Sequence, residues 1–244
     1  MSEGKIRQLI EKAESSLKTG SRKAAELMLF QALGIANETR NAKFTSKIMT
    51  IFKNIGLFLI TPQSIEIDPV KPDGLILDIG GGGEGVIGRL NGKQVVAIDT
   101  SERELAETHN EALKIVMDAS ELKFLPQSFH TCTAFFSMKY IAKAQHLKVF
   151  QEVHRVLRDE GKLLVWDVRI PVADKEYEQS IVPLKIQLQD ELIQTGYGVK
   201  WQVQNIEYFK QLAQQAGFTI MGERITGETF YLEMSKTDAS SKKQ

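Results

Sequence analysis

The stretch Asp78-Ile-Gly-Gly-Gly-Gly-Glu-Gly85 follows the apolar run Leu75-Ile-Leu77 and decides the fold. Glycines in a turn directly after a buried strand let a ligand lie against the main chain. Their spacing matches the dinucleotide fingerprint, which by itself favours a nicotinamide or flavin cofactor. However, Asp78 and Glu84 would place two negative charges beside a pyrophosphate. The stretch therefore predicts a strand, turn and helix that bind a cationic ligand.

Two further apolar strands also end on an aspartate. The first, Gln94-Val-Val-Ala-Ile98, ends in Asp99, about 20 residues after the first glycine, where a carboxylate commonly binds paired ribose hydroxyls. The second, Leu113-Lys-Ile-Val-Met117, ends in Asp118. Because the carboxyl ends of parallel strands meet at one edge of a sheet, where open α/β sheets bind ligands, we expect the aspartates to share one site.

In this order the motifs resemble the class I S-adenosylmethionine-dependent methyltransferases, over roughly residues 74 to 235. The resemblance continues through Phe129–Met138, Val153–Asp167 and Glu207–Phe218, which look like the family's later strands and helices. It implies S-adenosylmethionine as the cofactor, with Asp99 on the ribose hydroxyls. The residues that it assigns to the cofactor, from the methionine end to the adenine, are Asp78, Gly80, Gly81, Gly82, Asp99, Thr100, Asp118 and Ala119, with Ser137 as a further lining residue.

Three positions depart from the family's pattern. Glu84 displaces the third loop glycine, with Gly85 following, and this bears on the shape of the loop. His130 stands where an aspartate is usual after the start of the fourth strand, and we expect it to be a turn residue. Asp159-Glu-Gly161 replaces the usual Pro-Gly-Gly turn, a difference of packing and turn chemistry.

The composition is that of an ordinary globular protein of 244 residues, with 42% hydrophobic and 25% charged residues. Lysine plus arginine equals aspartate plus glutamate at 31 each, so no overall field attracts nucleic acid or an acidic membrane. The single cysteine, Cys132, excludes an internal disulfide or a thiolate metal site, and the histidines lack metal-ligand spacing, so we assign no metal. We expect a small-molecule substrate, no nucleic acid, no stable membrane insertion and a cytoplasmic location; the oligomeric state is not indicated.

Residues 1–66 predict an N-terminal helical cap or lid with helices over Glu3–Lys18, Ser21–Leu33 and about 41–60. The third helix contains the densest apolar run, Ile48 to Ile60, which is too short to cross a membrane. Packing on the main domain, a lid over the substrate and an interfacial anchor are all compatible with this run.

Residues 67–235 predict the S-adenosylmethionine-binding methyltransferase domain, an α/β, doubly wound, Rossmann-like fold with a seven-stranded, mostly parallel sheet and an antiparallel edge near 218–224 and 229–234. In an insertion at about 171–201, apolar residues alternate with polar ones from Val182 to Gln189. This alternation predicts a β-hairpin that turns near Gln189-Asp190, over the carboxyl edge of the sheet. Residues 236–244 predict a polar tail.

The leading hypothesis is methyl transfer to a small-molecule acceptor by in-line displacement, for which the enzyme must align the acceptor atom and the methyl group about 3 Å apart. A general base is optional, so the catalytic residues stay unassigned. Residues that follow strands at the functional edge, or lie in the insertion, are candidates for the acceptor side: Lys139, Tyr140, Asp167, Arg169, Tyr197 and Trp201, of which Tyr140, Arg169, Tyr197 and Trp201 are the substrate candidates.

Two alternatives stay open at this stage. The first is an NAD(P)-dependent oxidoreductase, favoured by the glycine spacing and disfavoured by Asp78, Glu84 and the later motifs. The second is a non-catalytic binding protein on a methyltransferase fold, which the altered glycine loop makes conceivable. Titration with each cofactor separates the first alternative from the leading hypothesis, and the second fails if S-adenosylmethionine binds at micromolar strength and Asp99→Ala abolishes the binding.

Overall fold

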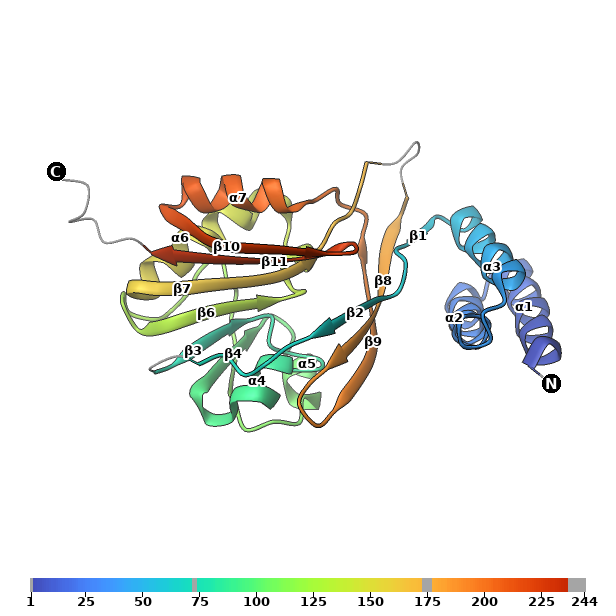
Figure 1. Cartoon of the computed structure of the whole chain (residues 1–244), viewed down its shortest axis with the longest axis horizontal. Helices are drawn as coiled ribbons and strands as arrows, with labels where there is room; N and C mark the ends of the chain where they lie inside the picture. The colour runs from blue at the N-terminus through green and yellow to red at the C-terminus, as the bar shows by residue number, and fades with distance from the viewer. Residues whose placement is uncertain (1, 72–73, 173–176, 237–244) are drawn as a thin grey trace. The chain divides into compact units, whose positions relative to one another are not determined.

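The structure is a computed structural model that describes residues 2–71, 74–172 and 177–236. The chain divides into two compact units, of which the first is Met1–Leu59 with Lys175–Ile181 and the second is Ile60–Asp174 with Val182–Gln244. Figure 1 labels the elements of both. The tail predicted for 236–244 lies outside the described residues except for Lys236, and the predicted insertion at 171–201 includes four residues, 173–176, that also lie outside them.

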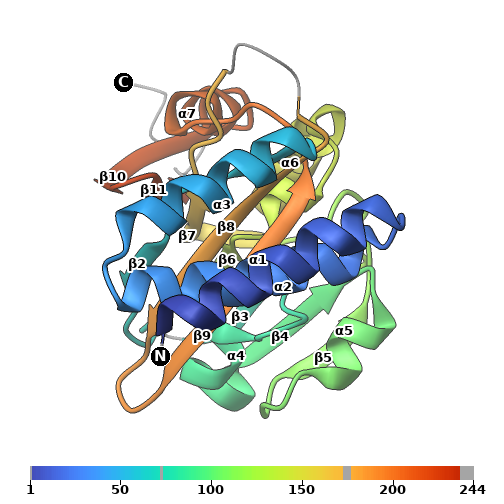
Figure 2. The same cartoon turned by 90° about the vertical axis from the view of Figure 1, so that its right-hand side faces the viewer.

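The first unit contains three helices, α1 (Ser2–Lys18), α2 (Arg22–Glu38) and α3 (Ala42–Asn54). Figure 2 shows α1 and α2 packed side by side. Apolar residues three and four positions apart form one face of each helix, and these faces bury a common core. Its fully buried members include Ile6, Ile10, Leu29, Ile48 and Phe52.

The third helix ends earlier than its apolar run predicts. The sequence predicts a helix to about residue 60, but α3 stops at Asn54 and Gly56 adopts a φ of 79°. A glycine with positive φ commonly ends a helix because it has no Cβ to strain. The remaining apolar residues form the strand β1 (Leu57–Leu59), which pairs in parallel with the start of β8 (Gln179–Gln187). The end of the predicted helix, residues 55–60, is therefore not helical, because strand pairing satisfies the backbone there.

The second unit is built on a seven-stranded sheet in the order β10-β11-β7-β6-β3-β4-β5. The strands are β3 (Ile76–Ile79), β4 (Val95–Asp99), β5 (Leu113–Val116), β6 (Phe129–Phe135), β7 (Leu157–Val168), β10 (Phe218–Thr226) and β11 (Thr229–Lys236). Strands β3 to β7 pair in parallel, and β10 and β11 form an antiparallel edge. The predicted fold class, a Rossmann-like sheet with an antiparallel edge, is confirmed.

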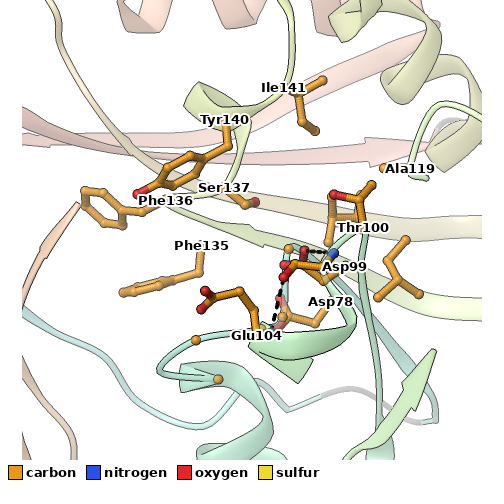
Figure 3. Close-up of a pocket in the computed structure, with 18 of the residues that line it drawn as sticks. Asp78, Asp99, Thr100, Glu104, Ala119, Phe135, Phe136, Ser137, Tyr140 and Ile141 are labelled. Carbon is orange, nitrogen blue, oxygen red and sulfur yellow. Dashed lines mark hydrogen bonds between the residues drawn. The ribbon is translucent and has the colours of Figure 1, made fainter. Parts of the chain in front are cut away.

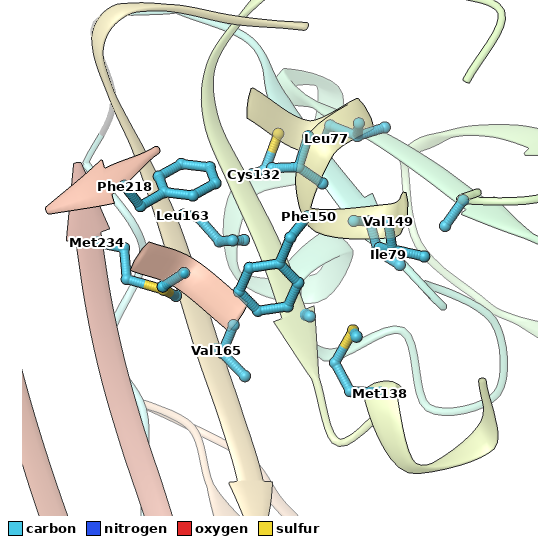
Figure 4. Packing of buried hydrophobic residues seen from close by; sticks show 14 of the residues in the cluster. Leu77, Ile79, Cys132, Met138, Val149, Phe150, Leu163, Val165, Phe218 and Met234 are labelled. Atoms are coloured by element: carbon cyan, nitrogen blue, oxygen red, sulfur yellow. The ribbon is translucent and has the colours of Figure 1, made fainter. Parts of the chain in front are cut away.

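Helices lie in several of the connections between the strands of this unit. They are α4 (Val86–Asn91), α5 (Glu102–Glu107), α6 (His146–Val156) and α7 (Ile206–Gln215), with short 3-10 turns at η1 (Gly92–Gln94), η2 (Met138–Tyr140) and η3 (Lys143–Gln145). Figure 4 shows Phe150 of α6 among buried residues of the sheet, including Leu77, Val165 and Met234. Burial of one such ring stabilises the fold by about 2–3 kcal/mol. This core holds the carboxyl edge of the sheet rigid.

The predicted hairpin forms in the insertion. Strand β9 (Leu192–Lys200) pairs with β8, and the Leu188 N–H donates to the Glu191 carbonyl to close the turn around Gln189-Asp190. Strand β2 (Gln63–Glu66) adds to β8 in parallel, with Ile65 opposite Ile186. The strict alternation of apolar and polar residues therefore predicted the strand correctly, because only one face of it is buried.

Two positions differ from their predicted turns. His130 is the second residue of β6 and not a turn residue, since residues 129–135 pair with β3 and β7. The segment Asp159-Glu-Gly161 lies inside the long strand β7, where Glu160 has a φ of 62° and the register with β6 shifts. An irregular residue of this kind lets the strand continue where the family pattern has a full turn.

Candidate active site

A cavity of about 790 Å³ lies at the carboxyl ends of β3, β4 and β6 and beside the segment that follows β5. Figure 3 shows aromatic rings on one side of it, with Asp99, Thr100 and Ala119 on the other. Its volume lies in the range that suits a cofactor with a small ligand, about 300–1,000 Å³. The carboxyl edge of the sheet is therefore hollow where the sequence predicts a site.

At Gly80 and Gly82, the turn after β3 packs too closely on its neighbours for a side chain. A Cβ on Gly80, whose φ is 70°, would lie 2.4 Å from the Cβ of Ser137, and one on Gly82 would lie 2.8 Å from the Cβ of Glu104. The N–H groups of Gly80 and Gly81 both donate to the Ile98 carbonyl, at 2.8 and 3.0 Å. These bonds hold the turn against β4 and leave bare backbone along the cavity wall.

Among the carboxylates that line the cavity in the described structure, Asp78 is the most buried, with 2% of its surface exposed. Its Oδ1 accepts a hydrogen bond of 2.7 Å from the Thr133 hydroxyl on the neighbouring strand β6. Burial raises the pKa of Asp78 to about 7, against the Thr133 hydrogen bond, which lowers it, and with a smaller rise from the charge of Asp99. The carboxyl group thus titrates near neutrality at the bottom of the glycine turn.

Asp99 and Asp118 are both held by short turns of their own main chain. Oδ1 of Asp99 accepts from the Ser101 N–H at 2.9 Å, and Oδ1 of Asp118 accepts from the Ser120 N–H at 2.7 Å. Both residues line the cavity. A turn role and a ligand role are therefore compatible, since the turn uses one oxygen of each carboxylate and fixes its direction.

Glu84, which departs from the family's glycine pattern, binds the hairpin. Its Oε1 accepts a short hydrogen bond from the Thr195 hydroxyl of β9, and Tyr197 also hydrogen-bonds Glu84. On the same segment, Arg89 bonds the Glu84 carbonyl at 2.7 Å and forms an ion pair of 3.1 Å with Glu191 at the hairpin turn. Glu84 therefore joins the glycine turn to a strand 111 residues further along the chain.

An aromatic wall, defined as Phe135, Phe136, Tyr140 and Tyr197, lines the cavity, and Figure 3 shows the first three of these on the side opposite Asp99. The ring centroids of Phe136 and Tyr197 stack at 5.7 Å, and Tyr140 meets Tyr197 edge-on at 6.5 Å. Phe136 has a φ of 52°, which is unusual for a bulky residue, and its N–H donates to the Trp166 carbonyl at 2.8 Å. This conformation turns the chain from β6 into η2 and brings Tyr140 to the cavity.

Lys139 lies behind the aromatic wall and does not line the cavity. Only 2% of it is exposed, and Nζ lies 4.3 Å from the ring centroid of Tyr197 and 4.9 Å from that of Phe136. Among the described residues, Nζ has no hydrogen-bond partner. Burial lowers the pKa of Lys139 and raises that of Asp167, whose Oδ1 accepts from Gln204 Nε2 at 2.9 Å. The negative charge of Asp167 offsets part of the fall in the Lys139 pKa, and the positive charge of Lys139 offsets part of the rise in the Asp167 pKa.

The charge of the cavity wall has a single sign. Within the part of the chain that the structure describes, five carboxylates and no lysine, arginine or histidine line it: Asp78, Glu84, Asp99, Glu104 and Asp118. Sequence reasoning missed Glu104, which lies one turn into α5, where its N–H donates to the Ser101 hydroxyl at 3.2 Å. The pattern Ser-x-x-Glu after β4 is a helix-capping signal that would have placed this side chain near the edge.

Most of the predicted site residues line the cavity, namely Asp78, Gly80, Gly81, Gly82, Asp99, Thr100, Asp118, Ala119, Ser137, Tyr140 and Tyr197. Two do not. Arg169 holds both carboxylate oxygens of Glu228, at 2.7 and 2.9 Å, on the outside of the cavity, and Trp201 also lies away from the cavity lining. Phe135, Phe136 and Thr195 line the cavity although no local motif marks them.

Neither a metal site nor a membrane-spanning helix is found in the described ranges. No group of three or more His, Cys, Asp or Glu residues within them is arranged to hold a metal ion. No helix there has both the length and the apolar character needed to cross a bilayer.

Comparison with known proteins agrees with this geometry. A family model described as a methyltransferase domain matches residues 77–165. No curated protein matches the chain. Among solved structures, an S-adenosylmethionine-dependent methyltransferase from Methanosarcina mazei superposes with a TM-score of 0.52 at 18% identity, over 71% of this chain and 99% of that one.

Two further structures share the fold. A protein from Pyrococcus horikoshii gives a TM-score of 0.52 at 18% identity, over 82% of this chain and 91% of that one. A methyltransferase from Aquifex aeolicus that depends on S-adenosylmethionine gives a TM-score of 0.50 at 14% identity, over 77% of this chain and 88% of that one. At these identities the superpositions establish the fold, and the family model establishes the domain. Residues 77–165 are therefore a methyltransferase domain, on a fold that this chain shares with solved S-adenosylmethionine-dependent methyltransferases.

Proposed function

We propose that this enzyme transfers the methyl group of S-adenosylmethionine to a small-molecule acceptor by in-line displacement, and that one cavity holds both molecules. The observation that carries the proposal is the charge of the wall, with five carboxylates and no cation among the described lining residues. S-adenosylmethionine supplies a methyl group attached to a positively charged sulfur. A wall of carboxylates attracts such a group and repels the pyrophosphate of a nicotinamide cofactor.

The cofactor residues that we propose follow the order of the strands. Asp78 and the glycine turn would hold the methionine end, because the bare backbone allows close approach and the buried carboxylate attracts positive charge. Asp99, with Thr100, would bind the ribose hydroxyls. Asp118 and Ala119 would flank the adenine, and Ser137 would line the cofactor opposite Gly80. The support is that all of these residues line the same cavity.

The acceptor side that we propose is the aromatic wall. Tyr140 and Tyr197 present rings to the cavity, and such rings exclude water and orient a planar or apolar molecule at little cost in side-chain entropy. Arg169 and Trp201 are not retained as acceptor residues, since they lie away from the cavity. No general base is assigned, because alignment and exclusion of water supply much of the rate where the acceptor attacks as a neutral molecule.

Two measurements test the proposal. Calorimetric titration is expected to show micromolar binding of S-adenosylmethionine and none of NADH; NADH binding of equal strength would favour the oxidoreductase alternative. Incubation with methyl-labelled S-adenosylmethionine and a metabolite extract is expected to give a labelled small molecule in the mass spectrum. Tight cofactor binding without any labelled product in extracts of varied origin would favour the non-catalytic alternative.

A further inference from the structure

A second cavity of about 470 Å³ lies in the same unit and shares no lining residue with the first. One wall consists of β7, β10 and β11, and the other of β2 and β8, with Leu192 of β9 at its side. Both walls are strand faces, whose strands are labelled in Figure 1. The proposed methyl transfer uses none of these residues, so the cavity needs its own explanation.

The first wall is a row of three cross-strand neighbours. Arg224 of β10 is paired with Tyr231 of β11, which is paired in turn with Trp166 of β7. Directly paired residues project on the same face of a sheet, so the three side chains form one continuous strip. The rings of Trp166 and Tyr231 are 4.9 Å apart, and the guanidinium carbon of Arg224 lies 5.7 Å from the Tyr231 ring centroid.

The second wall adds another cation. Lys185 and Gln187 project from the exposed face of β8, and their partners on β2 are Ser64 and Glu66. All four residues line the cavity, so a lysine of β8 and an arginine of β10 both border it. The two walls thus combine an aromatic strip with polar and charged side chains.

The charge of this cavity is positive. Lys185 and Arg224 have no ion-pair partner within 4.0 Å among the residues that the structure describes, and Glu66 is the one carboxylate of the described lining. Glu233, which accepts a hydrogen bond from the Tyr231 hydroxyl, is held by Lys162 at 2.8 Å. The cavity lining therefore contains two cations and one carboxylate, and neither cation forms an ion pair with a described residue.

We propose that this second cavity is a binding site for a planar aromatic acid. The ring of the ligand stacks on the Trp166 and Tyr231 strip, and its acidic group lies between Lys185 and Arg224. Offset ring contacts add to apolar burial, and a guanidinium that already packs on a ring is preorganised to bind a carboxylate. The cavity volume suits a ligand of one or two fused rings and is too small for a folded partner. The proposal does not depend on the function proposed for the first cavity.

The probe for the test is naphthalene-2-carboxylate, compared with naphthalene-2-carboxamide, which has the same ring without the charge. The chain has two tryptophans, so the indole N–H signal of Trp166 in a proton–nitrogen correlation spectrum is assigned with the variant Trp201→Phe. We expect the carboxylate to shift the Trp166 signal in a saturable way and to bind at least about tenfold more tightly than the carboxamide.

Variants of the two cations complete the test. Lys185→Gln and Arg224→Gln are each expected to weaken the carboxylate about tenfold, whereas Lys185→Arg retains binding and the matched surface control Lys148→Gln leaves it unchanged. Saturating S-adenosylmethionine is expected not to displace the probe. The proposal is overturned if carboxylate and carboxamide bind equally, if neither shifts the Trp166 signal at 10 mM, or if folded Gln variants bind as the parent does. The first two outcomes need no variant.

Discussion

The two cavities of the second unit carry opposite charge although the chain as a whole is neutral. Five carboxylates and no cation line the first cavity in the described structure, which we call the cofactor cavity after the function proposed for it, whereas Lys185, Arg224 and one carboxylate line the second. The first is built from loops that follow strands, and the second from the flat faces of paired strands. Net charge at the level of the whole chain therefore says nothing about the ligands of each site, because charged ligands respond to the local field.

Removal of one carboxylate from the cofactor cavity is expected to have the largest effect. Asp99→Asn keeps an acceptor for the Ser101 N–H but removes a charge and one oxygen from the cavity. We expect S-adenosylmethionine to bind about 100-fold more weakly by calorimetry. The matched control is Asp190→Asn in the exposed hairpin turn. Unchanged affinity in Asp99→Asn would show that the contrast in charge does not select the cofactor.

The pH dependence of cofactor binding sharpens the comparison next. Because the pKa of Asp78 is raised to about 7, its carboxylate is ionised above pH 7 and loses its charge as the pH falls below it. We therefore expect the affinity for S-adenosylmethionine to fall about tenfold between pH 8 and pH 6. Asp78→Asn is expected to bind weakly at both values. An affinity that is constant over this range in the parent enzyme would contradict the assignment.

The raised pKa of Asp78 also predicts how the stability of the cofactor-free enzyme depends on pH. Stability is expected to fall as the pH rises, whereas the affinity for the cofactor is expected to increase. A carboxyl whose folded pKa is raised contributes stability at low pH that is lost as the pH rises through about 7. Asp78→Asn, which retains an acceptor for Thr133, is therefore expected to be more stable than the parent at pH 8 by about 2 kcal/mol. Urea unfolding at pH 8 measures this. Equal stability of the two proteins would show that the burial of Asp78 costs little.

The attachment of the hairpin to the glycine turn is expected to matter less. In Glu84→Gln an amide replaces the carboxylate that accepts from Thr195 and Tyr197, and one charge leaves the cavity. We expect a loss of about threefold to tenfold in cofactor affinity and faster amide hydrogen exchange in β9. Loss of affinity without a change in exchange would indicate that Glu84 acts by its charge alone.

The ion pair at the hairpin turn is expected to have the smallest effect. Arg89 and Glu191 meet at 3.1 Å with partly exposed side chains, and exposed pairs contribute about 0–1 kcal/mol. Glu191→Gln should therefore change the free energy of unfolding by less than about 0.5 kcal/mol, and it leaves the bond from Arg89 to the Glu84 carbonyl intact. A larger change would mean that this contact, rather than Glu84, positions the hairpin.

Local patterns predicted much of the fold because each strand and turn carries its own signal. The glycine turn, the aspartates after β4 and β5, and the hairpin around Gln189 all follow from spacing within a few residues. The end of α3 did not follow from local spacing. The apolar run continues to Ile60, but Gly56 and the pairing of β1 with β8 end the helix before it. Where propensity and pairing conflicted, pairing decided.

The site was only partly predictable because several of its side chains depend on contacts with segments far away in the sequence. Glu84 accepts a hydrogen bond from a hydroxyl 111 residues away, and Lys139 is buried beside the rings of Phe136 and Tyr197. The residues next to Glu84 and Lys139 in the sequence therefore do not predict either environment. The outward position of Arg169 follows from its pairing with Glu228, which the turn between β10 and β11 supplies. Contacts between segments far apart in sequence require the register of the sheet, which no local motif specifies.

The amino-acid sequence alone predicted the class of the domain, the edge of the sheet where the first cavity lies and four of its five described carboxylates, because these follow from strand periodicity and from residues at or near strand ends. Only the tertiary structure decided which aromatic rings close that cavity, and that Arg224, Tyr231 and Trp166 stand in one row opposite Lys185. The physical reason is that a charge or a ring acquires its role from the groups that packing places beside it.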